Sequence, residues 1–380
     1  MANILTDLAA DIYKSAEVVG RELTGAISSM TINSVEGEAV ALNDTVRSFT
    51  TQEPTLNTTY APSMTIPEGN DQTVGNKTLV VSRVANVRIP FSGEDVKHLD
   101  NGAGYDNVLQ KQLQRAFRKI TNTIEGFACE TIAKGASRSV GTAGTTPFAS
   151  NFNIVAEGRQ ILVDNGTPMD GEVSMILDTA AGTKLRNLAQ LQKANEAGGD
   201  DMLRRGTLLD LQGVMLKETG SAYAHTKGTG ASYVTNGTFA VGETVIDIDG
   251  GSGTVLAGDI VTFQNDTNAY VVSEALAGGA ITLAAPGLRK SLADGLTVTL
   301  SANRTGNFIF HRAAAELVVR PPAQPKGGDA AADRMTVQDP FSGLVYEIAF
   351  YKGYNKNMID ITTLYGAKVW NDELVASVAG

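Results

Sequence analysis

The N-terminal third of the chain combines two long helical patterns with a polar segment between them. A first apolar stripe recurs at steps of three or four residues, which is typical of one helix face: Ile4, Leu8, Ile12, Ala16, Val19, Leu23, Ile27 and Met30. A second stripe predicts a helix from Asp106, an N-cap residue, to Gly135, a natural stop. With about 30 residues this second helix would be about 45 Å long, which is longer than a small domain is wide.

Between the two helices, residues 56–91 read as an extended ribbon without a core of its own. The outbound leg is rich in Pro, Thr and Asn, and the return leg, TLVVSRVANVRIPF, alternates apolar and polar side chains. An isolated two-stranded ribbon is at best marginally stable in water. The ribbon therefore needs another surface, and an identical neighbour can supply it. We interpret the chain as a self-assembling shell subunit. We favour an N-terminal arm that docks on a neighbour or on the inner face of the shell over a helix packed on its own domain.

From residue 152 the pattern alternates between helix and strand, which predicts a compact α+β body. FNIVAEGRQILVDNG and AAGTKLRNLAQLQKAN are predicted helices, and EVSMILD and TLLDLQGVMLKET are predicted strands. Further along, FIFHRAAAELVV is predicted to be a helix that ends at Pro321 and Pro322. Strands through Val345, Ile348, Tyr351, Met358 and Leu364 would then close the body.

The composition changes at Gly228. Residues 228–301 hold 12 of the 40 glycines, with seven acidic side chains against two basic ones. Short β-patterned runs (TVIDI, DIVTF, YVVSEAL, AITLA and LTVTLS) alternate with turn signals such as Asn236-Gly237 and Asp294-Gly295. The segment is predicted to be a small β-barrel or sandwich inserted into the α+β body.

The length, net charge and cysteine content of the chain exclude several classes of protein. A chain of 380 residues is expected to form two or more compact bodies. Its net charge of −10 argues against a protein whose main function is to bind nucleic acid, although a shell that encloses nucleic acid can be acidic. The single cysteine, Cys129, excludes an intrachain disulfide and is expected to be a buried thiol. No run approaches the ~20 apolar residues of a membrane span, and the N-terminus lacks the pattern of a signal peptide.

No enzyme signature is present. His98, His225 and His311 lie far apart in the sequence, and we expect Arg312 and Glu316 to form an i,i+4 pair on a helix. The two acids in the loop Gly198-Gly199-Asp200-Asp201 lack further ligands at a metal-binding spacing. We therefore assign no catalytic residue, cofactor or metal. Two alternatives stay open: a β-rich adhesin or surface-layer protein in which residues 228–301 bind carbohydrate, and a hydrolase with an undetected site.

The order of the predicted elements resembles a known family. NFIFHRAAAELVVRPP is followed some 40 residues later by ITTLYGAKVWNDELVASV, and RAFRKITNTIEGFACETIAKG precedes both. This order resembles the major capsid proteins of tailed phages with the Hong Kong 97-type fold. The chain is most similar to the short-tailed Salmonella phage coat proteins, which carry an inserted domain. In that comparison RAFRKITNTIEGFACETIAKG looks like the spine helix, and GDIVTF with AYVVSEALAGGAITLAAP looks like the inserted domain.

The resemblance implies an α+β fold with seven parts. These are an N-terminal arm (1–55), an extended loop (56–100), a peripheral domain with the spine helix (101–150), an axial domain (151–227), an inserted β-barrel (228–301), an axial return (302–325) and peripheral strands with the C-terminus (326–380). It implies a coat protein, not an enzyme, that forms hexamers and pentamers of an icosahedral shell around double-stranded DNA, without sequence-specific binding or cofactors. Scaffolding protein and portal are the implied partners, a decoration protein is left open, and no membrane is involved. The implied location is the virion capsid, assembled in the bacterial host cytoplasm.

The ribbon and spine helix supply the candidates for contacts between subunits: Glu68, Asp71, Lys77, Arg83, Arg88, Arg115, Arg118 and Lys119. The chain also departs from the family pattern. The inserted segment is shorter than in the Salmonella phage branch, and it lacks the long charged loop that joins inserted domains across two-fold axes there. No long segment precedes the arm, so we do not expect a fused scaffold, and we do not expect a covalent Lys–Asn crosslink.

Overall fold

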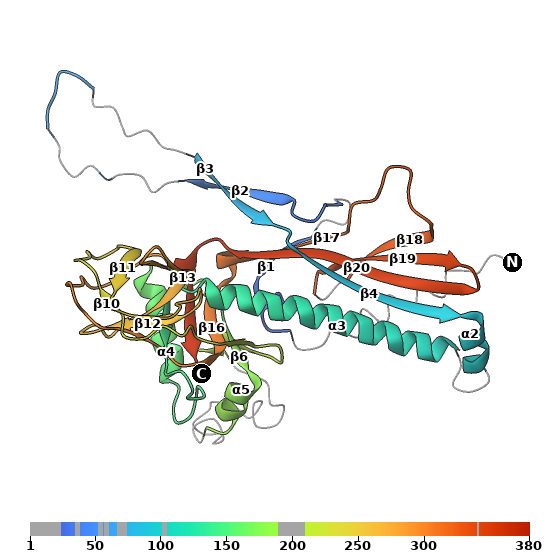
Figure 1. The fold of residues 1–380 in the computed structure, drawn as a ribbon, viewed down its shortest axis with the longest axis horizontal. Coiled ribbons are helices and arrows are strands. Elements are labelled where there is room, and N and C mark those ends of the chain that lie inside the picture. Colours follow the sequence, from blue (N-terminus) through green and yellow to red (C-terminus); the bar gives the residue numbers. More distant parts are fainter. Residues whose placement is uncertain are drawn as a thin grey trace.

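The computed structural model describes residues 24–34, 39–51, 56, 61–66, 74–100, 105–188, 210–339 and 342–380. These residues form a mixed α+β fold with few helices and many strands. One half is elongated and consists of long strands and one long helix, and the other half is compact (Figure 1). A two-stranded ribbon leaves the junction of the two halves and projects past the compact end.

The elongated half is a six-stranded sheet with a helix on one face. Its strands are β1 (Thr31–Ser34), β17 (Ala315–Arg320), β20 (Lys356–Val369), β19 (Val345–Gly353) and β18 (Ala331–Gln338), with β4 (Arg83–Ser92) also paired to β20. The β1–β17 pair is parallel and the other pairs are antiparallel. Helix α3 (Tyr105–Lys134) packs chiefly on β4 and β20, and α2 (Gly93–Asp100) joins β4 to it.

The period-two pattern of β20 gives this sheet an apolar face and a polar face. Ile359 and Ile361 are buried in the core that includes α3. Asp360, between them, lies on the opposite face, where Asn86 Nδ2 donates to its Oδ1 atom at 2.6 Å and Arg88 Nε lies 3.5 Å away. The polar face therefore consists of side chains that pair with one another across strands.

Helix α3 confirms the predicted spine-like helix at nearly the predicted bounds. Ile120 and Ile124 are fully buried, and the Phe117 ring packs edge-on against Tyr346 at 5.1 Å between centroids. The lone Cys129 is 0% exposed, and its burial raises the pKa of its thiol well above the usual value. The expectation of a buried thiol is confirmed.

The compact half surrounds a central strand, β16 (Arg304–His311), which pairs with strands on both sides. The other members are β5 (Arg138–Val140), β6 (Val173–Asp178), β7 (Asp210–Leu211), β8 (Val214–Thr219), β9 (Tyr223–His225) and β21 (Val375–Ala379), with helices α4 (Asn153–Asp164) and α5 (Thr179–Arg186). Asp178 caps α5, because its Oδ1 atom accepts a hydrogen bond from Ala181 N at 3.0 Å. The helix predicted from residue 152 and the strand predicted at EVSMILD are confirmed. The second predicted helix is shorter than expected, since α5 ends at Arg186, and the strand predicted at TLLDLQGVMLKET is divided into β7 and β8 by a turn at residues 212–213.

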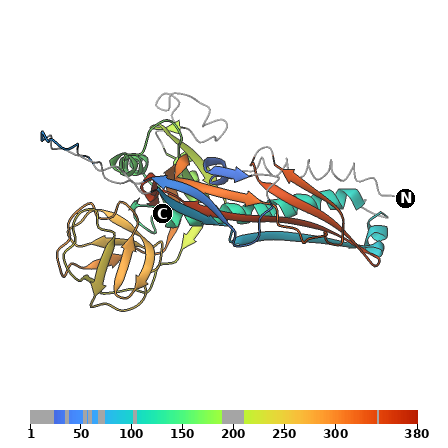
Figure 2. The same ribbon diagram turned by 90° about the horizontal axis from the view of Figure 1, so that it is seen from above.

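Residues 228–301 form a separate group of short strands around their own apolar core. The strands are β10 (Val234–Thr235), β11 (Val245–Asp249), β12 (Ile260–Phe263), β13 (Ala269–Ala277), β14 (Ala280–Leu283) and β15 (Val298–Leu300). Ile246, Tyr270 and Ile281 are fully buried in that core. Figure 2 shows the group as a lobe beside the rest of the compact end. One ladder joins it to the main body, because β13 pairs with β5 at Tyr270 and Arg138.

The prediction that FIFHRAAAELVV forms a helix is wrong. The segment consists of β16, the 3₁₀ turn η2 (Arg312–Ala314) and β17. Phe308, Ile309 and Phe310 are all buried, and a strand buried on both faces shows no period-two signal in its sequence. The expected Arg312–Glu316 helical pair does not form, since Arg312 lies 3.5 Å from Glu172 and Glu316 accepts from Trp370 Nε1 at 2.7 Å.

Two predictions for the N-terminal region also change. Most of the first apolar stripe, residues 1–23, lies outside the described residues. Its last part is not α-helical, because a 3₁₀ turn, η1 (Ile27–Ser29), leads into β1. The ribbon starts earlier than residue 56, since β2 (Thr45–Thr51) pairs with β3 (Val74–Val80). The strand is interrupted at Val81 and Ser82, and the chain then continues as β4 in the six-stranded sheet. The segment predicted to be one return leg therefore belongs to two different sheets.

The last connection is the 3₁₀ turn η3 (Asp372–Leu374), between β20 and β21. It carries the chain from the elongated half back to the compact half, where β21 pairs with β16 and β5. None of the helices in the described part of the chain has the length and apolar character needed to cross a membrane.

The ribbon meets the sheet at a glycine, which gives a testable prediction. A Cβ atom on Gly366 of β20 would lie 2.3 Å from the carbonyl oxygen of Val80 at the end of β3. We expect Gly366→Ala to lower the free energy of unfolding by about 1–3 kcal/mol, because backbone atoms must shift. Gly220→Ala is the matched control, since a Cβ there meets nothing within 4 Å. Urea unfolding measures both variants, and equal stabilities would contradict the close contact.

Candidate assembly surface

The base of the β2–β3 ribbon is fixed to the elongated half. Leu79 and Val81 are 1% and 0% exposed and pack against Val318 and Leu364. Lys368 Nζ donates to the carbonyl oxygen of Thr78 at 2.8 Å. These contacts set the direction in which the ribbon leaves the sheet.

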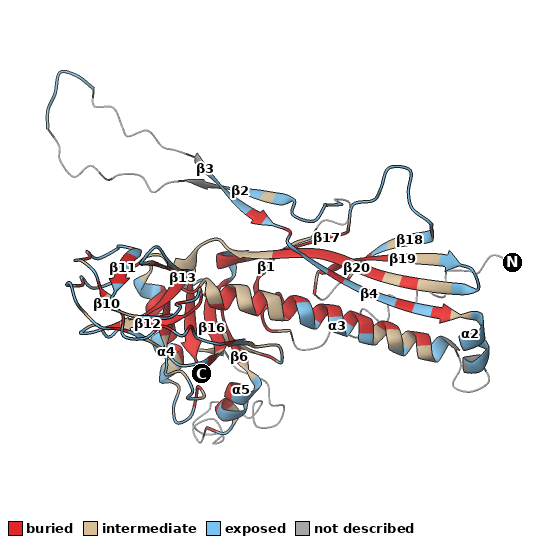
Figure 3. Cartoon of the chain, in the orientation of Figure 1, coloured by how far each residue is buried: buried red, intermediate tan, exposed pale blue. Residues whose placement is uncertain are grey.

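Beyond its base the ribbon exposes large apolar side chains. Leu56, Met64 and Ile66 are 83%, 105% and 91% exposed, and every residue from 61 to 66 is exposed. Figure 3 shows the described part of the loop as exposed throughout and distant from both cores. Exposed apolar side chains of this size at one end of a projecting segment are typical of an interaction surface.

A groove of about 350 Å³ lies between α3 and β4. Its apolar lining, here called the floor, consists of Val87, Ile89, Pro90 and Ala116. Its polar lining, here called the rim, consists of Arg115, Lys119, Gln112 and Arg88, and the Arg88 guanidinium also lies 3.5 Å from Asp360 across the strand. Arg115 and Lys119 are four residues apart, so they share one side of the helix. The Oε1 atom of Gln112 is buried and has no hydrogen-bond partner among the described residues. The groove thus combines an apolar floor with a basic rim.

The groove contains three of the eight predicted contact residues, Arg88, Arg115 and Lys119. Two others lie near the ribbon and are held within the chain: Lys77 Nζ donates to the carbonyl oxygen of Trp370, and the Arg83 guanidinium lies 5.2 Å from the centre of the Phe127 ring. Arg118 is exposed on α3. Glu68 and Asp71 lie outside the described residues. A role of these eight residues between subunits stays a prediction.

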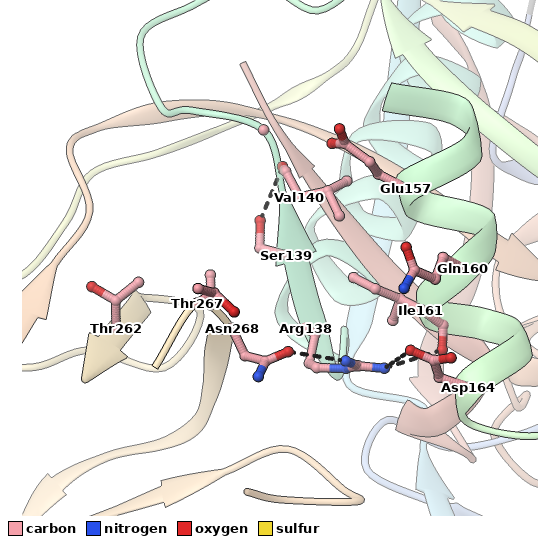
Figure 4. Close-up of a pocket in the computed structure, with 12 residues that line it drawn as sticks. Arg138, Ser139, Val140, Glu157, Gln160, Ile161, Asp164, Thr262, Thr267 and Asn268 are labelled. Atoms are coloured by element: carbon pink, nitrogen blue, oxygen red, sulfur yellow. Dashed lines mark hydrogen bonds and ion pairs between the residues drawn. The ribbon is translucent and has the colours of Figure 1, made fainter. Parts of the chain in front are cut away.

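A second cleft, of about 430 Å³, separates α4 from the strands of residues 228–301 (Figure 4). Arg138 of β5 lies at its base, 5% exposed, and burial lowers the pKa of its guanidinium. Its Nη1 atom donates to Asn268 Oδ1 at 3.2 Å, and its Nη2 atom lies 3.5 Å from Asp164 Oδ2. Arg289 Nη2 donates to the carbonyl oxygen of Asp164 at 3.1 Å. We interpret Arg138 as a clamp that joins the β-rich lobe to α4.

A buried His–Asp pair provides a second clamp, where the chain enters and leaves the lobe. His225 Nε2 lies 2.8 Å from Asp259 Oδ1, and both side chains are buried. Leu256 N and Gly228 N also donate to Asp259 Oδ2, at 2.7 and 3.1 Å. Burial would raise the pKa of Asp259, but these hydrogen bonds outweigh it, so the pKa lies below its usual value.

Arg304 completes this clamp, since its Nη2 atom donates to the carbonyl oxygen of Gly258. Burial lowers the pKa of Arg304 to about 10, so the side chain stays cationic at neutral pH. Arg138, Asp259 and Arg304 were not among the residues predicted from the sequence to be functional. Each acts through partners distant in the sequence, so no motif or spacing marks them.

The histidines do not converge on a catalytic arrangement. His225 pairs with Asp259, His311 Nε2 lies 3.1 Å from Asp170 Oδ1, and His98 is exposed on α2. In the part of the chain that the structure describes, no group of three His, Cys, Asp or Glu residues could hold a metal ion. The two paired histidines therefore have structural partners, with a carboxylate beside each ring.

Comparison with known proteins gives matches to solved structures alone. No protein-family model matches the chain, and no curated protein matches it. A structure from Mycobacterium phage Che8 is 13% identical with a TM-score of 0.49, covering 88% of this chain and 84% of that chain. The mature capsid of bacteriophage PhiM1 is 10% identical (TM-score 0.49; 94% and 87% covered), and the capsid of Ralstonia phage GP4 is 9% identical (TM-score 0.45; 94% and 91% covered).

The His225–Asp259 clamp predicts how stability depends on pH. The folded pKa of Asp259 lies below the unfolded value of about 3.9, so its contribution is present above that pH and is lost as the pH falls through the folded pKa. We expect Asp259→Asn to cost about 1–3 kcal/mol at pH 7 and to weaken the acid dependence. Asp247→Asn, at an exposed position of β11, is the control. Urea unfolding between pH 7 and pH 3 measures the free energy of unfolding of each variant. The clamp would be contradicted if Asp259→Asn, like Asp247→Asn, had the same free energy of unfolding as the wild type at every pH.

Proposed function

We propose that this chain is the major capsid protein of a tailed phage, which assembles into hexamers and pentamers of an icosahedral shell around double-stranded DNA. One observation carries the proposal. The ribbon has a fixed base but an apolar end, with Leu56, Met64 and Ile66 exposed, that its own chain leaves uncovered. Copies of the chain can bury these side chains in one another, and repetition of such a contact around symmetry axes gives a closed assembly.

The order of elements along the chain supports the same proposal. A projecting ribbon, a long helix on an elongated sheet, a compact α+β half and a β-rich lobe follow the order of the family resemblance. In this proposal α3 and the long strands belong to the peripheral domain, α4 and α5 belong to the axial domain, and residues 228–301 are the inserted domain. Scaffolding protein and portal would take part in assembly in the host cytoplasm. The net charge of −10 is consistent with a shell that encloses DNA without binding it tightly.

We further propose that the α3–β4 groove of one copy receives the ribbon end of another. The apolar floor, with Ile89 and Pro90, suits Met64 and Ile66. The basic rim suits Glu68 and Asp71, which follow Ile66 in the sequence. Charge complementarity of this kind fixes orientation more than it adds affinity.

The carbohydrate-binding alternative loses its main support. Such sites present exposed aromatic rings, but Tyr233, Phe239, Phe263 and Tyr270 of residues 228–301 are 7%, 9%, 2% and 0% exposed. All four belong to the core of the β-rich lobe. They serve the packing of the lobe and present no stacking platform.

Replacing the exposed apolar side chains of the ribbon should separate folding from assembly. Met64→Ser with Ile66→Ser should change the free energy of unfolding by less than about 0.5 kcal/mol, since both side chains are exposed. The same variant should assemble few or no closed particles in sedimentation and electron microscopy. Val241→Ser, at a 61% exposed site on the lobe, should assemble normally. Wild-type particle yield from the double variant would remove the role of the ribbon.

Reversing the charge of the groove rim tests its pairing with the ribbon. Arg115→Glu with Lys119→Glu should reduce particle yield, because the rim would repel Glu68 and Asp71. Adding Glu68→Lys and Asp71→Lys should restore much of the yield, since the opposite charges face each other again. Lys184→Glu, an exposed position on α5, is the control for net charge. Sedimentation velocity measures the yield, and failure of the compensating changes to restore it would contradict this pairing.

A further inference from the structure

Strand β4 is an edge of the six-stranded sheet. In the described part of the chain it pairs with β20 alone, so one side of its backbone has no ladder partner. Ser92 shows which groups face outward, because its N–H donates to Asp95 Oδ2 at 3.0 Å instead of to β20. Ladder bonds alternate along an antiparallel pair, so the N–H and C=O groups of Asn86 and Arg88 also face outward. Pro90 fits the same alternation, since a proline has no N–H to give to a ladder.

The outward edge of β4 is open to solvent and has two unlike faces. The side chains of Asn86 and Arg88 are exposed on the polar face of the sheet, beside Asp360. The alternate side chains point to the α3 side, where Val87 and Ile89 line the apolar floor of the groove. An open strand edge of this kind can bind a further strand through backbone hydrogen bonds.

Residues 61–66, at the ribbon end, have the pattern of a strand that lacks a partner. Each of these residues is exposed, and within the part of the chain that the structure describes no strand pairs with them. Met64 and Ile66 would form one apolar face of a strand, and Ser63 and Thr65 would form a polar face. Thr65 N donates to Ser63 Oγ at 3.2 Å, a local bond that pairing with another strand can replace.

One antiparallel register matches the hydrogen-bonding groups of the two segments. It places Thr65 opposite Asn86, and this pair exchanges two backbone hydrogen bonds. It also places Ser63 opposite Arg88, where a second pair of the same kind forms. Pro90 lies outside both pairs, so its missing N–H costs neither of them a bond. Side chains of opposite residues lie on the same face, so these four polar side chains share the polar face of the sheet.

The same register brings apolar side chains together on the α3 side. Met64 lies opposite Val87 in a non-hydrogen-bonded pair, the kind in which side chains come closest. Ile66 lies opposite Ala85, which is already buried. The pairing thus buries apolar surface that the ribbon of a single copy leaves in water. A shift by one residue would move Met64 and Ile66 to the polar face, so the register is well specified.

We propose that residues 61–66 of one copy add to the edge of β4 in a second copy as an antiparallel strand, with Thr65 opposite Asn86. This strand addition rests on the proposed capsid function, in which a second copy is always adjacent. It adds to that function the way in which the ribbon end is bound. Backbone pairing fixes the direction and register of the ribbon end, and the groove receives its apolar face.

Disulfide trapping in assembled particles tests the register. Non-hydrogen-bonded pairs have Cα atoms about 4.5 Å apart, within the range that a disulfide spans. We expect Met64→Cys with Val87→Cys to link two copies on oxidation, which a non-reducing gel detects as covalent oligomers. The matched control, Met64→Cys with Arg88→Cys, should link about tenfold less or not at all, because position 88 faces the other side of the sheet. Cys129 is buried and should add no background.

The outcomes separate the strand addition from the capsid function. Particles that form without a link between positions 64 and 87, or with equal linking at position 88, would overturn the strand addition and leave the capsid function standing. A wild-type protein that forms no particles under any condition would contradict both.

Hydrogen exchange of the wild type tests the same pairing without any substitution. The backbone amides of Asn86, Arg88, Ser63 and Thr65 should exchange about tenfold or more slowly in particles than in unassembled subunits, because each gains a ladder bond. The amide of Met64 faces away from β4 in this register, so it should be protected less than its two neighbours. Mass spectrometry with residue-level fragmentation measures these rates. Equal exchange of the Asn86 and Arg88 amides in subunits and particles would overturn the proposal.

Discussion

The packing of α3 against the β4–β20 ladder is the contact on which the rest of the structure depends. Ile120, Ile124, Ile359 and Ile361 are buried together there, and the helix and strands run side by side along the long axis (Figure 1). β4 continues from the ribbon, so this packing fixes the ribbon base. Glu125 of α3 holds the N-terminal segment, and the chain beyond Lys134 leads into β5 of the compact half. One helix thus orients the ribbon, the N-terminal exit and the compact half.

The distribution of charge separates two kinds of surface on this frame. On the polar face of the long sheet, Arg88 lies beside Asp360, and Arg334 pairs with Glu347 and Asp329. These charges largely neutralise one another. The exposed sides of α3 carry Lys111, Arg115 and Lys119 on a chain whose net charge is −10. Such a local basic strip suits acidic segments of protein, and the acidic remainder of the chain would repel nucleic acid.

Sequence patterns predicted those elements that have one buried face. α3 and β4 show clear periods of 3.6 and 2, because one side of each is polar. The segment FIFHRAAAELVV does not show a strand pattern, because β16 is buried on both faces and therefore lacks a period of 2. The first ribbon strand, Thr45–Thr51, was missed because its sequence is mostly polar. Of the candidate surface, Arg115 and Lys119 were among the predicted contact residues, whereas the groove with Ile89 and Pro90 depends on strand pairing that no local pattern contains. The Arg138 and Asp259 clamps join distant residues for the same reason.

The central claim is that copies of this chain bury one another's ribbons. Electron microscopy of the purified full-length protein under assembly conditions tests it most directly. The account predicts closed shells with five- and six-fold positions, in which each ribbon lies on a neighbouring copy with Met64 and Ile66 in contact. Particles in which the ribbons point into solvent, or a protein that stays monomeric at every concentration, would contradict it.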